Sequence, residues 1–113
     1  MVVYGLELDD PEAFGYVASS LSKVAEAAGI ELIPVWSNHY LHYRNEDAKD
    51  HFAFRYNKFM GAALAAVGHA LVERLSVVSI SADYDIPSQR LHGSHPLLDP
   101  NYSGAGLRVR HEN

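Results

Sequence analysis

The sequence contains no cysteine, and it also lacks long apolar runs. Without cysteine the chain can form neither a disulfide framework nor a thiolate metal site, which fits a reducing cytoplasm. No stretch approaches the roughly 20 apolar residues that a membrane-spanning helix needs, and the N-terminus has neither the basic start nor the cleavage pattern of a signal peptide. We therefore expect a soluble, cytoplasmic protein that makes no membrane contact.

Positive charge is scarce as well. The 9 Lys and Arg residues are outnumbered by 14 Asp and Glu residues, and the formal net charge is −5. Proteins that bind nucleic acid neutralise its phosphates with clustered Lys and Arg side chains, and no such cluster occurs in this sequence. A small molecule is therefore the expected ligand, rather than DNA or RNA.

Several familiar nucleotide-binding and catalytic motifs do not occur. They are the phosphate-binding loop Gly-x-x-x-x-Gly-Lys-Ser/Thr, the dinucleotide fingerprint Gly-x-Gly-x-x-Gly and the nucleophile elbow Gly-x-Ser-x-Gly. Any contact with a phosphate group must therefore come from other residues.

The residues that are present have a globular balance, with 48% apolar and 20% charged among 113. This length favours a single domain over residues 1–113. The first part of the sequence predicts a strand, a helix and a second strand. An apolar, β-branched run over 2–8 is followed by Asp10 and Pro11, a helix cap and a proline suited to the first helical position. Apolar residues then recur every three or four positions up to Gly29, and a second strand is expected over 30–36. This βαβ pattern predicts a parallel sheet.

The second part adds one helical region and two more strands. The helical region spans about 52–72, with a break near Asn57 or Gly61, and strands are expected over 75–82 and 107–111. Apolar and polar residues alternate along the expected fourth strand, which indicates that one of its faces is exposed. We expect His69 to be an ordinary helix residue with a local hydrogen bond. The predicted fold is α/β, with three layers around an open and mainly parallel sheet.

The stretch 92–103 is the part of the chain that packing alone does not explain. It brings two imidazoles, two hydroxyls and a carboxylate together with two prolines and a glycine, so it can be neither a regular helix nor a central strand. Rigid, polar loops often carry sites. The alternative is a long polar connection in which the prolines and Ser94 only form turns.

Histidine pairs at 39 and 42 and at 92 and 95 raise a second hypothesis, a His-rich metal-binding hydrolase. Asp83, Asp85 or Asp99 could add oxygen ligands. The spacing of these pairs is not the helical i, i+4 spacing of metalloproteases, so the pattern does not select this hypothesis.

Four short motifs in this order resemble the middle of the adenine-nucleotide alpha-hydrolase-like proteins, the N-type ATP pyrophosphatases related to 7-cyano-7-deazaguanine synthase and asparagine synthetase. The motifs are Gly5-Leu6-Glu7-Leu8-Asp9, Ser37-Asn38, Gly68-His69-Ala70-Leu71, and Gly93-Ser94-His95-Pro96-Leu97-Leu98-Asp99-Pro100 with Tyr102-Ser103. The last is the most specific. The resemblance implies an incomplete Rossmann-like domain of the HUP type, which binds ATP with magnesium at the carboxyl edge of its sheet. Such enzymes cut ATP between the alpha and beta phosphates and use the adenylate to activate a small-molecule substrate.

The resemblance also implies roles for individual residues. Asp9 and Asn38 would lie near the nucleotide, and Arg44 or Arg90 would contact pyrophosphate. The residues near the activated group would be His92, Ser94, His95 and Asp99. Because α/β folds bind ligands at the carboxyl ends of their strands, we expect these side chains to converge there with Asn38 or Arg44.

The sequence departs from this family at its defining motif. The Ser-Gly-Gly-x-Asp-Ser pyrophosphate loop of the first, central strand is absent, so we expect a fragment or subdomain of a longer protein. A non-catalytic binding or oligomerisation module that has lost ATP cleavage is the alternative. A sheet without its central strand exposes backbone hydrogen-bonding groups, so we expect a homo-oligomer or completion by another chain.

Overall fold

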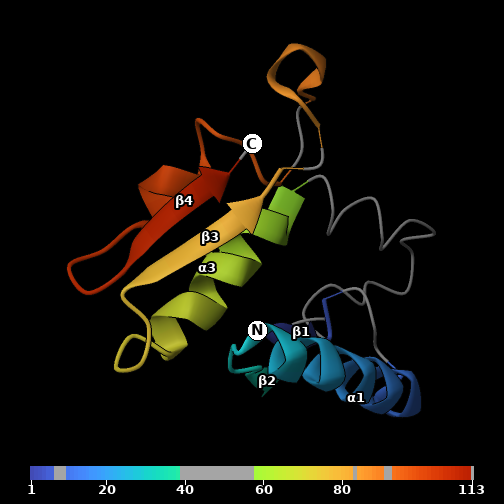
Figure 1. Ribbon diagram of the computed structural model, residues 1–113. Helices are drawn as coiled ribbons and strands as arrows, with labels where there is room; N and C mark the ends of the chain where they lie inside the picture. The colour runs from blue at the N-terminus through green and yellow to red at the C-terminus, as the bar shows by residue number, and fades with distance from the viewer. Residues whose placement is uncertain (7–9, 39–57, 83, 91–92, 113) are drawn as a thin grey trace. The chain divides into compact units, whose positions relative to one another are not determined.

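The computed structural model describes residues 1–6, 10–38, 58–82, 84–90 and 93–112 (Figure 1). The chain divides into two compact units, Met1–Lys49 and Asp50–Asn113, each of which is described by itself below. The predicted single domain over 1–113 stays a prediction. No helix in the described part of the chain is long and apolar enough to cross a membrane.

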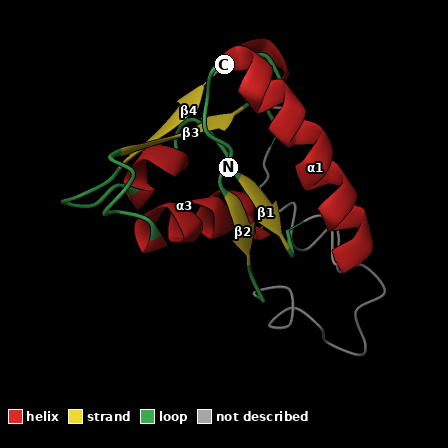
Figure 2. Cartoon of the chain, turned by 60° about the horizontal axis from the view of Figure 1, so that its bottom comes forward, coloured by secondary structure: helices red, strands yellow, loops and turns green. Residues whose placement is uncertain are grey.

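The first unit is the predicted strand, helix and strand. Strand β1 (Val2–Tyr4) pairs in parallel with β2 (Pro34–Trp36), and α1 (Pro11–Ala28) connects them in sequence (Figure 2). Both strands are shorter than the predicted spans of 2–8 and 30–36. Gly5 takes a φ of 85° directly after β1, which turns the chain away from the strand direction. The β2 ladder begins only where Pro34 faces Val2.

Helix α1 begins and ends at the residues that the sequence predicts. Asp10 Oδ1 accepts hydrogen bonds from the backbone N–H groups of Glu12 at 2.8 Å and Ala13 at 3.2 Å, and Pro11 is the first helical residue. At the other end Gly29 has a φ of 67°, and its N–H donates to the carbonyl of Glu26. These local contacts account for both ends of the helix.

An aromatic cluster holds the first unit together. The ring of Tyr4 lies 5.4 Å from that of Phe14 and 4.7 Å from that of Trp36, and Phe14 and Trp36 are 4.8 Å apart between ring centres. Of the predicted apolar face of α1, only Phe14 and Ala25 are buried, and Val24 is 64% exposed. The apolar periodicity is thus correct for the helix but overstates how much of it is covered.

The second unit contains α3 (Met60–Ala70) and two parallel strands, β3 (Val77–Ser81) and β4 (Arg108–Glu112). A single turn of wider helix at residues 58–59 precedes α3, next to the predicted break. The two short 3-10 helices are η3 (Ile86–Ser88) and η4 (Asp99–Tyr102). The predicted spans 75–82 and 107–111 therefore contain strands, and the loop 92–103 contains no regular α-helix or strand among its described residues.

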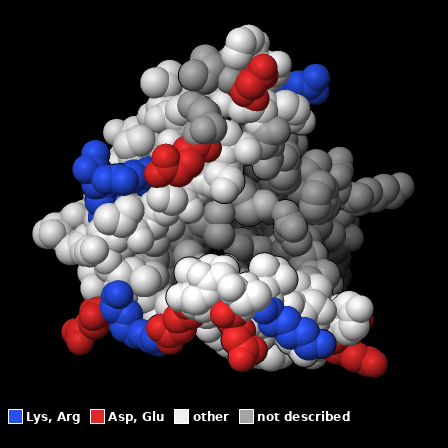
Figure 3. Space-filling model, viewed as in Figure 1, with Lys and Arg blue, Asp and Glu red and all other residues white. Residues whose placement is uncertain are grey.

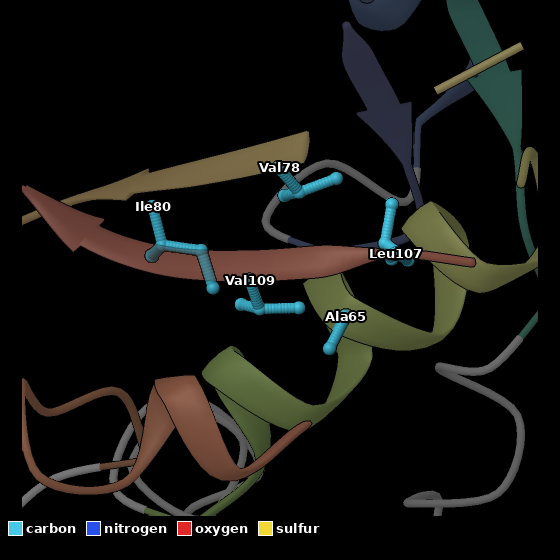
Figure 4. Close-up of a cluster of buried hydrophobic side chains, with 5 residues drawn as sticks. All are labelled: Ala65, Val78, Ile80, Leu107 and Val109. Atoms are coloured by element: carbon cyan, nitrogen blue, oxygen red, sulfur yellow. The ribbon is translucent and has the colours of Figure 1, made fainter. Parts of the chain in front are cut away.

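The core of the second unit lies between the strands and α3. Figure 4 shows Val109 projecting from β4 toward α3, where Ala65 lies. The buried cluster consists of Ala65, Val78, Ile80, Leu107 and Val109. Residues on the opposite face of both strands are exposed, so the predicted one-sided exposure of the fourth strand is confirmed.

Two parallel two-stranded sheets and two helices in the described residues make the fold α/β with open sheets, as predicted. One three-layer sheet of the Rossmann type is a finer prediction, and it is taken up below as a proposal.

Candidate functional site

The candidate site lies at the carboxyl edge of the β3 and β4 pair. Because the strands are parallel, their last residues, Ser81 and Glu112, face each other at one edge. Figure 1 shows the first turn of α3 beside the end of β3. The N–H of Gly61, in this first turn, donates to the carbonyl of Gly93 at 2.8 Å. This hydrogen bond therefore joins the beginning of the loop 92–103 to the start of α3.

Asp99 is the centre of this edge. Its side chain is fully buried and accepts three hydrogen bonds. The Ser94 hydroxyl donates to Oδ2 at 2.6 Å, the backbone N–H of His95 donates to Oδ1 at 3.3 Å, and Nδ1 of His111 lies 2.8 Å from Oδ2. A buried carboxylate is tolerated when its oxygens are satisfied in this way. We call Ser94, Asp99 and His111 the Asp99 network.

The start of α3 adds a favourable electrostatic environment. A side-chain carbon built on Gly61 would collide with Oδ1 of Asp99, so the carboxylate lies directly against the first turn of the helix. The positive end of the helix dipole stabilises an anionic group in that position. Glycine at position 61 is therefore what allows the carboxylate to approach so closely.

Local hydrogen bonds explain why residues 95–101 fold into a compact turn. The carbonyl of His95 accepts from the N–H groups of both Leu98 and Asp99 at 2.9 Å, and Nδ1 of His95 accepts from the N–H of Leu97 at 3.2 Å. The amide of Asn101 donates to the carbonyl of Leu97 at 2.8 Å. Hydrogen bonds among the turn's own polar groups therefore stabilise the turn, and this conformation places Asp99 in its buried position.

The far end of the loop is fastened by residues that are distant in sequence. Nε2 of His69 lies 2.7 Å from the carbonyl of Tyr102, and the Ser103 hydroxyl accepts from the N–H of Val109 at 3.0 Å. The prediction that His69 makes only a local hydrogen bond is wrong, because this bond joins α3 to η4. His69 is a structural residue, but its partner is supplied by the tertiary fold.

The structure brings two of the predicted catalytic residues into direct contact. Ser94 and Asp99 are both buried and hydrogen-bonded to each other. His95 is half-buried and joins them through its backbone, while its ring supports the turn. A hydroxyl that donates to a carboxylate is held in place by it, so this geometry favours a positioning role for Ser94 over that of a nucleophile.

The other predicted site residues are not shown at this edge. Asn38 is an exposed residue of the first unit. Arg90 is exposed, and its guanidinium carbon lies 5.6 Å from the centre of the Tyr84 ring. Three predicted site residues lie outside the described residues: Asp9, Arg44 and His92. The predicted convergence of all these side chains thus stays a prediction.

His111 is the member of the network that the sequence analysis did not single out. It lies on β4 two positions after the buried Val109, so both side chains point to the covered face of the sheet. A polar side chain at a covered strand position needs a hydrogen-bonding partner. The place of His111 in the strand pattern could therefore have identified it from the sequence. Its partner, Asp99, is supplied by the packing of η4 against β4 and by no local motif.

Within the described residues, no group of three or more His, Cys, Asp or Glu side chains is arranged to hold a metal ion. Most members of the two histidine pairs, His39, His42 and His92, lie outside those residues, as does Asp83. The metal-hydrolase hypothesis therefore gains no support from this edge.

Comparisons of the chain with family models, with curated proteins and with solved structures find no match. The resemblance to the ATP pyrophosphatases thus stays a hypothesis based on the sequence motifs.

Proposed function

We propose that this chain forms the nucleotide- and substrate-binding part of an ATP-dependent adenylating enzyme of the ATP pyrophosphatase type. The observation that carries the proposal is the position of the Asp99 network at the carboxyl edge of two parallel strands, beside the start of a helix. Open α/β sheets bind their ligands at that edge. The segment 93–103, which carries the strongest resemblance to the family, supplies Ser94 and Asp99 of the network.

In this proposal the network acts as a frame. Asp99 fixes Ser94, the backbone of His95 and the ring of His111 beside the strand ends where the ligand would bind. A site built on packed and fully bonded side chains holds its geometry better than one on a loose loop. In this proposal the turn therefore holds the site residues in position, and the exposed residues around the turn contact the ligand.

The phosphates require positive charge. Figure 3 shows Lys and Arg side chains beside Asp and Glu side chains on the face that it draws. The candidates for a phosphate contact are Arg90, which is not shown at this edge, and Arg44, which lies outside the described residues. The oxygens of Asp99 are already engaged by hydrogen bonds, so this carboxylate is not offered to magnesium. Magnesium in such sites is usually held by the substrate phosphates together with one or two carboxylates. We therefore expect it to arrive with ATP.

The finer fold that accompanies this proposal is a three-layer sheet of the incomplete Rossmann (HUP) type. The described strands form two separate parallel pairs, β1 with β2 and β3 with β4, instead of one sheet. In the described part of the chain each of these strands pairs with one neighbour, and a strand edge without a partner can recruit a further strand. We propose that a second copy of the chain, or another chain, supplies a strand that completes the sheet.

Light scattering tests the completed sheet. We expect a dimer or larger assembly at micromolar concentration. A monomer mass together with a folded circular-dichroism spectrum would contradict this part of the proposal, while leaving ATP binding to be judged separately.

Calorimetric titration of the full chain with ATP and magnesium tests the nucleotide site. Arg90→Ala should weaken ATP binding by about 10- to 150-fold, because a charge-assisted hydrogen bond contributes about 1.5–3 kcal/mol. Arg108→Ala is the matched control, because Arg108 is exposed at the opposite, amino end of β4 and should not change the affinity. Absence of any binding heat with the unaltered chain would refute the proposed function.

A non-catalytic binding module is the second candidate, and the absent Ser-Gly-Gly-x-Asp-Ser loop favours it. Both candidates predict ATP binding. Only the enzyme releases pyrophosphate when small carboxylic acids are added, so a pyrophosphate assay on the same samples separates them.

A further inference from the structure

One polar atom of the Asp99 network has no hydrogen-bonding partner among the described residues. It is Nε2 of His111, the ring nitrogen that does not face Asp99. The His111 side chain is only 3% exposed, and Nε2 itself is buried. Leaving a buried polar group without a hydrogen bond is unfavourable, so such atoms are rare in folded proteins and often belong to sites.

The contact with Asp99 determines what this atom can do. A carboxylate oxygen only accepts hydrogen bonds, so a ring that holds a single proton carries it on Nδ1, 2.8 Å from Oδ2. The proposal below is made for this form of the ring. Nε2 then carries a lone pair and is an acceptor. Asp99 is fully buried and is itself held by Ser94 and by the backbone of His95, so it also fixes the orientation of the ring.

This chemistry selects the class of group that could meet Nε2. A phosphate oxygen is itself an acceptor, and the nearby carboxylate repels its charge. A divalent metal would need further ligands, and the described residues provide no group of three. A neutral N–H or O–H group satisfies the lone pair without a charge conflict.

We propose that Nε2 of His111 accepts a hydrogen bond from an amino or hydroxyl group of a bound ligand, namely of the nucleoside part of ATP and not of its phosphates. This assignment rests on the proposed function. His111 is the penultimate residue of β4, at the edge where α/β folds bind ligands. Nε2 is closed to solvent in this structure, so the proposal requires this position to become accessible when the ligand binds.

The direct test follows the ring nitrogens of His111 by NMR in the full chain labelled with nitrogen-15. Without ligand, Nδ1 should be protonated and Nε2 unprotonated. ATP with magnesium should shift the Nε2 signal, whereas inorganic triphosphate should not. Inosine triphosphate, 2′-deoxy-ATP and 3′-deoxy-ATP then locate the donor. Loss of the shift with the first assigns it to the amino group, and loss with either of the others to a hydroxyl. A shift that persists with all three overturns the assignment to the nucleoside.

A pair of variants gives a second measurement. His111→Phe should weaken ATP binding by about tenfold, which corresponds to about 1.4 kcal/mol. His69→Phe is the control, since Nε2 of His69 is already bonded to the carbonyl of Tyr102. It should lower the melting temperature but leave the ATP affinity of the folded protein unchanged.

The outcomes separate the two proposals. If ATP does not bind the unaltered chain, both the proposed function and the role of His111 are refuted. If ATP binds while the Nε2 signal and the affinity of His111→Phe stay unchanged, the atom holds a bound water only, and the role of His111 alone is refuted.

Discussion

The two units of this chain use the same kinds of element but hold them together differently. In the first, three-residue strands rest on the aromatic cluster of Tyr4, Phe14 and Trp36, and much of α1 is exposed. In the second, five-residue strands share an aliphatic core with α3. The buried carboxylate of Asp99 joins the loop 92–103 to β4 through His111. The first unit therefore depends on packed aromatic rings beside a largely exposed helix, and the second depends on an aliphatic core together with a buried polar network.

This difference bears on function. A ligand site needs side chains whose positions are fixed by packing and by further hydrogen bonds. The second unit meets that requirement around Asp99. Trp36, the single tryptophan, lies in the first unit, so its fluorescence reports on that unit while circular dichroism reports on both. Comparing the two signals during unfolding tests whether the units respond separately.

The largest effect is expected from Asp99→Ala. This substitution leaves the Ser94 hydroxyl, the His95 N–H and the His111 ring without their buried acceptor. Removing one partner from a buried, charged network typically costs about 3–5 kcal/mol of unfolding free energy. Urea unfolding followed by circular dichroism measures the loss. Asp85→Ala, at an exposed position, is the control and should change stability by less than about 0.5 kcal/mol. Equal effects of the two substitutions would show that the network is not structural.

Leu107→Ala should destabilise the second unit by about 2–5 kcal/mol, because it leaves a cavity in the buried cluster. Leu107 is 2% exposed, whereas Leu97 is 82% exposed and provides the matched control. Chemical denaturation of both variants gives the comparison. If Trp36 fluorescence shifts together with circular dichroism, the two units unfold as one, and the contrast drawn above does not extend to their stability.

Two glycine substitutions should act in opposite directions. A side-chain carbon on Gly93 would lie 2.5 Å from the backbone nitrogen of Phe59 and 2.7 Å from that of Met60, so Gly93→Ala should cost about 1–3 kcal/mol. Gly15 lies in α1 with nothing within 4 Å of such a carbon, and Gly15→Ala should add about 0.5–1 kcal/mol through helix propensity. Melting temperatures check both signs. A neutral Gly93→Ala would mean that the loop is not pressed against the start of α3.

Asp10→Ala should have a small effect, a loss of about 1 kcal/mol of stability, because the helix cap of the first unit is removed. Trp36 fluorescence during urea unfolding measures it. Asp10→Ser retains an oxygen that can cap the helix and should keep most of the stability. If both substitutions destabilise equally, the cap is not what Asp10 contributes.

Features set by neighbouring residues could be predicted from the sequence. Asp10, Pro11 and Gly29 mark the ends of α1 because caps and glycine ends depend on local chemistry. Ser94 and Asp99 could be grouped because they lie in one rigid loop. The ends of the strands could not be predicted as well, because they depend on which residues pair. Pro34 begins β2 because Val2 lies opposite it.

Features set by distant residues could not be found in this way. No local pattern connects His111 with Asp99, or His69 with Tyr102, because α3, β3 and β4 must assemble before these pairs meet. The periodicity of α1 predicted an apolar face correctly, but coverage of that face depends on what packs against it. Val24 is therefore exposed despite its place in the pattern.

The parallel pairing of β3 with β4 also bears on how fast the chain folds. Its register joins Val77 to Arg108, so the whole connecting segment must close into a loop before the first ladder bond forms. Closing a long loop costs conformational entropy before any of the new contacts can stabilise the chain. Proteins with many contacts between residues distant in sequence therefore fold more slowly. Helix α3 and β3 are neighbours in sequence and can associate early. We therefore expect the hydrogen bonds of Asp99 to form after the rate-limiting step, so that Asp99→Ala mainly accelerates unfolding and leaves the folding rate nearly unchanged.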